Sequence, residues 1–216
     1  MVNLTLLSTV LAAGQLVSGH AAITQATGDL GGAGSALGII ADTPRDGTGR
    51  KPFQQDATAF RGQAADVCGR TLAGGDNDIE KGTAAILAAN AAAGNSTQLP
   101  QVSAGGKLTM TLHQVNADGA GAYTCMIDAT GTGAKWVPIT VSTNVDGSAR
   151  GVNQKGSKTD NVLVADIPAG QTCTGTVAGQ SNVCMVRCQN PARAGPFGGC
   201  VPVQLANGSG AAAASS

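Results

Sequence analysis

The clearest alternation of apolar and polar positions lies in Lys107–His113. Leu108, Met110 and Leu112 alternate there with lysine, threonine and histidine residues. Side chains of a strand point alternately to its two faces, so this pattern predicts a β-strand with one face in a core. It places His113 at the end of the strand, on the polar face. A glycine-rich loop, Asp118–Gly121, follows soon after.

Five further short segments are rich in β-branched residues and are separated by turn residues. They are Trp136–Val141, Val162–Ala165, Thr174–Val177, Val183–Arg187 and Val201–Leu205. Many short strands of this kind favour a mostly β protein, an antiparallel β-sandwich, over an α/β fold. Few periodic elements are visible between Ala21 and Arg70, so we expect long loops there.

One helix is predicted, from Asn77 to Ala93. Asn77 can cap it, Glu80 stands three residues on as in a capping box, and Gly94 can end it. The sequence Asn95-Ser96-Thr97 follows at once and is a glycosylation sequon, as is Asn207-Gly208-Ser209. We therefore expect a glycoprotein with surface loops at both positions.

The ends of the chain differ in character from its middle. Residues 1–19 form an uncharged apolar run that ends in Val17-Ser18-Gly19. This predicts a secretory signal peptide cleaved before His20, because the run is too short and too broken for a membrane span. We expect residues 20–206 to form a single β-sandwich domain. Residues 207–216 are glycine, alanine, serine and one asparagine, which predicts a disordered tail.

Charge and cysteine content narrow the class of protein. The net charge is zero and no basic patch is present, so we expect no nucleic acid and no membrane as partner, and a monomer. All six cysteines follow His20, and an even number in a secreted chain predicts three disulfides, with fifteen possible pairings. The alternative, a zinc site, fits poorly because the spacings from Cys173 to Cys200 match no zinc pattern. Aromatic residues are scarce, and we expect Tyr123 and Trp136 to pack in the core.

The chain contains two histidines, His20 and His113. If cleavage makes His20 the first residue, its free amine and its imidazole offer two nitrogen donors on one residue. Together with a second imidazole they suit copper, which leads to the hypothesis of a copper-binding histidine brace. The alternative for His113 is a solvent-facing histidine without a role.

Other catalytic chemistries find little support. Asp76, Asp78 and Glu80 suit the start of the predicted helix, where acidic side chains complement the dipole, and nothing else marks a hydrolytic pair. No nucleophile-elbow sequence accompanies His113, so a serine triad is disfavoured. The glycines of residues 31–34 lack the lysine that a phosphate loop needs.

Three segments carry a family resemblance: His20–Ile23, Thr111–Cys125 and Val186–Cys200. Their most specific part runs from Arg-Cys-Gln-Asn-Pro at residue 187 to Gly-Pro-Phe-Gly-Gly-Cys ending at Cys200. They resemble the Egh-like, appressorium-associated virulence factors that filamentous pathogenic fungi secrete. The resemblance implies an extracellular protein with a role in host infection, acting on a host surface component or a cell-wall component. It implies no known reaction.

The same segments are more distantly similar to fungal lytic polysaccharide monooxygenases. That similarity implies an immunoglobulin-like or monooxygenase-like sandwich, with His20 and His113 as copper ligands and Phe197 as axial neighbour. A glutamine found in some branches two residues before the aromatic is replaced by Gly195, and Arg187 or Gln189 are candidate substitutes.

Two interpretations remain open. One is a secreted virulence-associated factor that binds copper, and the other is a copper-dependent monooxygenase acting on a cell-wall polysaccharide. The scarcity of aromatic side chains for stacking on sugar rings favours the first.

Overall fold

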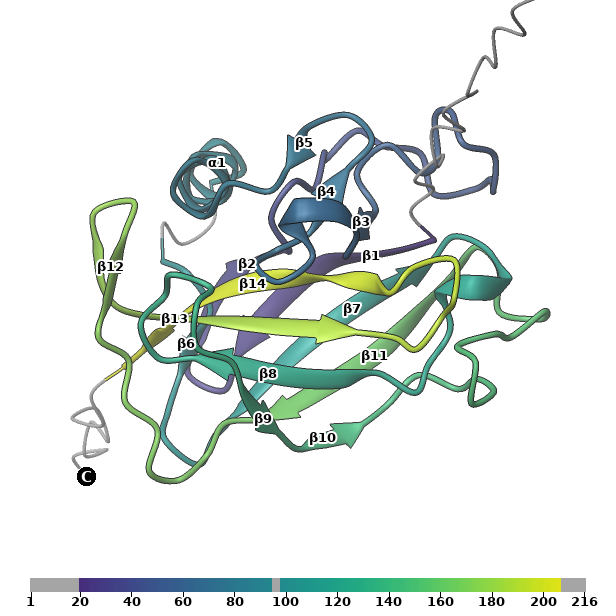
Figure 1. The fold of residues 1–216 in the computed structure, drawn as a ribbon. Coiled ribbons are helices and arrows are strands. Elements are labelled where there is room, and N and C mark those ends of the chain that lie inside the picture. The colour runs from purple at the N-terminus through teal and green to yellow at the C-terminus, as the bar shows by residue number, and fades with distance from the viewer. Residues whose placement is uncertain (1–19, 95–97, 207–216) are drawn as a thin grey trace, which may run out of the picture.

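A computed structural model describes residues 20–94 and 98–206. It confirms the mostly β fold class: two antiparallel sheets stack on each other, with one α-helix at the side (Figure 1). The predicted signal peptide, both sequons and the predicted tail lie outside the described residues. Among the residues that are described, no helix is both long enough and apolar enough to cross a membrane.

The elements follow one another in short steps along the chain. The strands are β1 Ala21–Gly28, β2 Gly31–Gly34, β3 Thr58–Ala59, β4 Arg70–Thr71, β5 Gly75–Asp76, β6 Gln101–Val102, β7 Lys107–Gln114, β8 Thr124–Asp128, β9 Val137–Ile139, β10 Val141–Thr143, β11 Thr159–Asp166, β12 Gly175–Val177, β13 Gln180–Gln189 and β14 Phe197–Leu205. The helix α1 spans Ile79–Ala92, and two 3₁₀ turns span Gly62–Ala64 and Ala117–Gly119.

The first sheet has the strand order β10-β11-β7-β1-β2. The second has the order β5-β4-β3-β14-β13-β8-β9, with β12 added beside β13 and β6 beside β14. The strand pairs are antiparallel except β6 with β14. Figure 1 shows the second sheet in front of the first, with α1 beside its upper edge.

The main core fills the space between the two sheets. Strand β7 contributes Leu108, Met110 and Leu112, which are at most 1% exposed, as its alternation predicts. The facing sheet contributes Val186 and Phe197, both fully buried. A second, smaller core lies between the second sheet and α1. Burial of apolar surface in these two cores is the main force that holds the layers together.

Strand β1 corrects the expectation of long loops after Ala21. It is an eight-residue strand that pairs with β7 on one side and β2 on the other. Its register shifts between Ile23 and Gln25, so the apolar alternation is interrupted. Its inward side chains include the small Ala21 and Ala26. A bulge and small side chains together hide the period-two pattern from sequence inspection.

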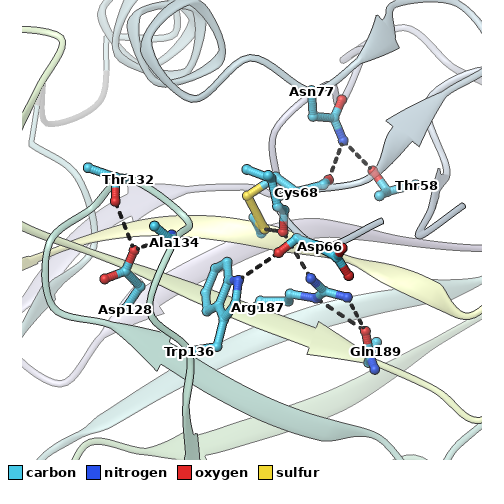
Figure 2. The surroundings of a disulfide bond; sticks show 12 residues. Thr58, Asp66, Cys68, Asn77, Asp128, Thr132, Ala134, Trp136, Arg187 and Gln189 are labelled. Carbon is cyan, nitrogen blue, oxygen red and sulfur yellow. Dashed lines mark hydrogen bonds between the residues drawn. A yellow bond between two sulfur atoms is a disulfide. The ribbon is translucent and has the colours of Figure 1, made fainter. Parts of the chain in front are cut away.

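Two boundaries also differ from the prediction. The helix begins after Asp78, whose side chain accepts a hydrogen bond from the Lys81 amide at 2.9 Å. Asn77 donates instead to Thr58 and to the Cys68 carbonyl (Figure 2). The segment predicted as one strand over Trp136–Val141 is split, because β9 pairs in the second sheet and β10 in the first.

Three disulfides form, as the cysteine count predicts. They join Cys68 with Cys200, Cys125 with Cys188 and Cys173 with Cys184. The Cys125–Cys188 bond joins paired residues of neighbouring strands β8 and β13. The Cys68–Cys200 bond ties the segment before β4 to β14.

Candidate metal centre

The two histidines lie near the same end of the ladder formed by β1 and β7, because His20 immediately precedes β1 and His113 is the last residue but one of β7. Ala22 of β1 is paired with His113 of β7, and the Val115 amide donates to the His20 carbonyl at 3.0 Å. His20 therefore stands one diagonal step from His113 on the same side of the ladder. Diagonal neighbours in an antiparallel pair are about 7–8 Å apart, which long side chains can span.

His113 lies on the face of β7 away from the core, as predicted, yet it is only 2% exposed. Its Nδ1 lies 2.7 Å from Oδ1 of Asp160, the residue paired with it on β11. A carboxylate at this distance accepts the Nδ1 proton, which leaves the lone pair on Nε2. That Nε2 atom is buried and has no hydrogen-bond partner within the described chain.

His20 presents the second open nitrogen. Its Nδ1 atom is buried and forms no hydrogen bond with any described residue. Oδ2 of Asp118 lies 3.5 Å from it, which is a charge contact too long for a strong hydrogen bond. Burial lowers the pKa of His20, and the nearby Asp118 carboxylate offsets part of this effect. The site therefore favours the neutral imidazole, which is the form that binds metals.

Phe197 lies against His20, the residue beside which the more distant similarity to monooxygenases implies an aromatic ring. The two rings are stacked, with centroids 4.4 Å apart and an angle of 23° between their planes. Phe197 is fully buried at the start of β14 and belongs to the main core. The core thus fixes one face of the His20 ring.

The loop after β7 fixes the backbone of His20. A Cβ atom added at Gly119 would lie 1.9 Å from the His20 carbonyl oxygen, so only glycine allows this approach. The hydroxyl of buried Tyr123 donates to the Gly119 carbonyl at 2.9 Å. Burial raises the pKa of Tyr123 far above its usual range, so the hydroxyl remains a donor at physiological pH. Tyr123 is therefore a core residue, as expected, and it also holds the loop beside His20.

Arg187 and Gln189 are not brought to the histidines. Both side chains lie on the outer face of β13, whereas Cys188 belongs to the core between the sheets. Gln189 Oε1 accepts from Nε and Nη2 of Arg187 at 3.2 and 2.6 Å, and Nη1 donates to the Val67 carbonyl at 3.1 Å. Because side chains alternate along a strand, these two residues face away from the sandwich interior that contains Phe197.

Aromatic rings complete the surroundings of Arg187. Its guanidinium lies 4.1 Å from the ring centre of Phe60 and 5.7 Å from that of Trp136. Figure 2 shows Trp136 beside Arg187, with its indole nitrogen bonded to the Asp66 carbonyl and the disulfide of Cys68 above. This cluster has the contacts of a structural element: each guanidinium nitrogen has an acceptor.

The donor set has a clear gap. No group of three or more histidine, cysteine, aspartate or glutamate side chains within the described ranges is arranged to hold a metal ion. Two imidazole nitrogens are therefore the side-chain donors that the site offers. A brace needs a third nitrogen, which the backbone amine of His20 would supply if the chain were cleaved before this residue.

Sequence inspection missed Asp160 and Asn190. Asp160 orients His113 only because β11 pairs with β7 in this register. Asn190 bonds to both segments that flank His20. Its place in the most specific motif of the family resemblance was the only available signal.

The chain is therefore a disulfide-linked antiparallel β-sandwich that carries a histidine pair. The model of the Egh16-like virulence factors matches residues 18–198, so the chain belongs to the Egh16-like family. It is 55% identical over 202 residues to the appressoria-specific virulence factor GAS1 of Pyricularia oryzae, covering 94% of this chain and 78% of that protein. It is 37% identical over 134 residues to GAS2 of the same fungus, covering 60% of this chain and 46% of that protein. These matches confirm the resemblance to the Egh-like virulence factors.

Proposed function

We propose that this protein is a secreted copper-binding factor that acts at a host or fungal wall surface during infection. Copper is held by the imidazole of His20, by its amine after cleavage, and by the imidazole of His113. The observation that carries the proposal is the pair of buried ring nitrogens, Nδ1 of His20 and Nε2 of His113, which have no hydrogen-bond partner among the described residues. Buried polar atoms are rarely left unpaired unless a ligand or function uses them.

The chain supports such a site in three ways. Asp160 fixes the tautomer of His113 and points Nε2 away from the carboxylate. Phe197 and Gly119 fix the ring and the backbone of His20. Burial favours neutral His20, so metal binding does not have to displace a proton from the ring. Copper bound to two imidazoles and an amine is stable as Cu(I) and Cu(II) and supplies one-electron chemistry.

The biological setting is proposed from relatives. GAS1 and GAS2 are named as appressoria-specific virulence factors. Secretion follows from the signal peptide predicted for residues 1–19, whose removal also creates the amine. Both proposals therefore depend on cleavage between Gly19 and His20.

The test begins with the N-terminus of protein secreted by a eukaryotic host. Mass spectrometry and N-terminal sequencing establish whether the chain starts at His20. Titration with Cu(II), followed by electron paramagnetic resonance, then measures stoichiometry and ligand type. We expect one Cu(II) per chain with nitrogen hyperfine structure, and loss of that signal in His113→Ala. A mature chain that begins elsewhere, or that binds no copper, ends the proposal.

The alternative is a copper-dependent lytic polysaccharide monooxygenase. Phe197 favours it, because an aromatic ring lies beside His20 at the position that the resemblance implies. Against it, Arg187 and Gln189 bond to each other on the outer face of β13 and do not replace the glutamine absent at Gly195.

Incubation of copper-loaded protein with a reductant and insoluble β-glucan, cellulose or chitin separates the two functions. Oxidised oligosaccharides detected by mass spectrometry, and absent with His113→Ala, favour the enzyme. Tight copper binding without such products favours the binding factor.

A further inference from the structure

Asn190 follows the last residue of β13 and is 2% exposed. Its amide group donates from Nδ2 to the carbonyls of Asp118 at 2.7 Å and Ala120 at 2.8 Å. Its Oδ1 accepts from the amides of Phe197 at 2.9 Å and Ala192 at 3.3 Å. Both donors and both lone pairs of this side chain are therefore used.

These bonds join the two segments that enclose the His20 ring. On one side is Phe197, whose ring stacks on His20 and whose carbonyl also accepts from the Asn190 backbone amide at 2.9 Å. On the other side is the turn that contains Asp118, whose carboxylate lies beside His20 Nδ1. The turn at Asp118 lies 72 residues before Asn190 and Phe197 lies 7 residues after it, and Asn190 bonds to both of them directly.

We propose that Asn190 is a positioning residue for the copper site. It acts through Phe197 and the Asp118–Ala120 turn, and it sets where the His20 ring and its Nδ1 atom stand relative to His113. The inference rests on the proposed copper binding, and it adds the residue that aligns the site. Asparagine is required because one short side chain must present two donors to carbonyls and an acceptor to amides.

Asn190→Asp is the sharpest test because it keeps the shape and removes both donors. A carboxylate oxygen then faces the two carbonyl oxygens of Asp118 and Ala120. Asn190→Ser is the second variant, since it is neutral, smaller and more readily folded. The matched control is Asn77→Asp, because the amide of Asn77 also donates twice, to Thr58 Oγ1 and the Cys68 carbonyl, beside the Cys68–Cys200 bond (Figure 2).

The first readout is the copper site. We expect Cu(II) affinity to fall by about 10–100-fold in both Asn190 variants, as for other residues that orient metal ligands, and the Cu(II) hyperfine pattern to change. Asn77→Asp lowers thermal stability but leaves affinity and spectrum as in the wild type. If both Asn190 variants keep the wild-type affinity and spectrum, or if Asn77→Asp changes them equally, the inference is overturned.

The second readout needs no metal. Phe197 shifts the NMR resonances of the His20 ring protons through its ring current, so displacement of either ring moves these signals. We expect clear changes in both Asn190 variants and none in Asn77→Asp, all measured on metal-free protein. Wild-type protein that binds no copper ends the proposed function alone. Unchanged His20 signals in the Asn190 variants end the inference alone.

Discussion

Two regions of this sandwich bury ionisable side chains, and they differ in whether the polar atoms of these side chains have hydrogen-bond partners. On the outer face of the second sheet, every nitrogen of the Arg187 guanidinium has an acceptor, and two aromatic rings flank it. At the end of the β1–β7 ladder, one ring nitrogen of each histidine is buried without a hydrogen-bond partner in the described chain.

The difference shows which property marks a site. Burial and charge are common to both regions, and both contain residues singled out from the sequence. What separates them is unmet bonding capacity: leaving a buried polar atom unpaired costs about 1–3 kcal/mol, which a purely structural region avoids. The Arg187 region is built for stability. The histidine region leaves two buried ring nitrogens without hydrogen-bond partners among the described residues, which is what a site for the proposed copper ion requires.

The largest expected effect is a loss of stability in the structural region around Arg187. Replacing Cys68 and Cys200 by serine removes a bond that spans 132 residues, whereas the Cys173–Cys184 bond spans 11. Chain entropy alone predicts losses of about 5 and about 3 kcal/mol in the free energy of unfolding. Urea unfolding of the two double-serine variants measures both. An equal loss in the two would contradict this ranking.

Arg187→Ala comes next. It leaves Gln189 Oε1 and the Val67 carbonyl without their donor and removes the contact with Phe60, so we expect a loss of about 3 kcal/mol in the free energy of unfolding. Arg187→Met keeps much of the packing and should lose less. Copper affinity should stay within about twofold of wild type in both, because the cluster faces away from the histidines. A large fall in copper affinity would mean that the two regions are coupled.

Asp160→Asn tests the second of the two regions, the one that contains the histidines. The Asp160 side chain is 65% exposed, so we expect little change in the free energy of unfolding. The amide no longer fixes the Nδ1–H tautomer of His113, and Cu(II) affinity should fall about 10-fold. Isothermal titration of metal-free protein measures this. Asp166→Asn changes a partly exposed carboxylate at the other end of the same strand, so it is the control and should leave affinity unchanged.

The smallest expected effect is on the way stability depends on pH in acid. Burial acts to raise the pKa of Asp128, but hydrogen bonds from Thr130 and from the amides of Ala134 and Gly133 outweigh it and hold the pKa below its usual 3.8. A carboxyl with a lowered folded pKa adds stability above the unfolded value, and this is lost as the pH falls through the folded value. Asp128→Asn should therefore unfold with a shallower dependence on pH below about 4. Urea midpoints between pH 5 and pH 2 test this, and parallel curves would refute it.

Much of the fold was predictable where apolar positions alternate. The strand predicted over Lys107–His113 is β7, and its alternation correctly placed His113 at the strand end, away from the core. Strand β1 was missed because its inward residues are small and a bulge shifts their phase. The alternation of apolar and polar residues identifies a strand well only when no bulge interrupts it.

The site was predictable only in its histidines. Their pairing rested on rarity and on the predicted cleavage. The structure places His20 directly before β1 and His113 on the neighbouring strand β7, while copper binding stays a prediction. Asp160 and Asn190 could not be found, because strand register and long-range loop contacts bring them to the site. The alternative of a solvent-facing His113 is wrong, because tertiary packing covers this position on the polar face of the strand.

The close approach of Gly119 to the His20 carbonyl gives a criterion for comparing the sequences of relatives. Any side chain at this position would push the first strand away and dislodge the proposed chain end, whatever else the sequence retained. The residue at the position of Gly119 in a relative therefore indicates whether its N-terminal histidine lies as it does here. Relatives with a larger residue at this point are the natural candidates for members in which the proposed metal site does not form and only the scaffold remains.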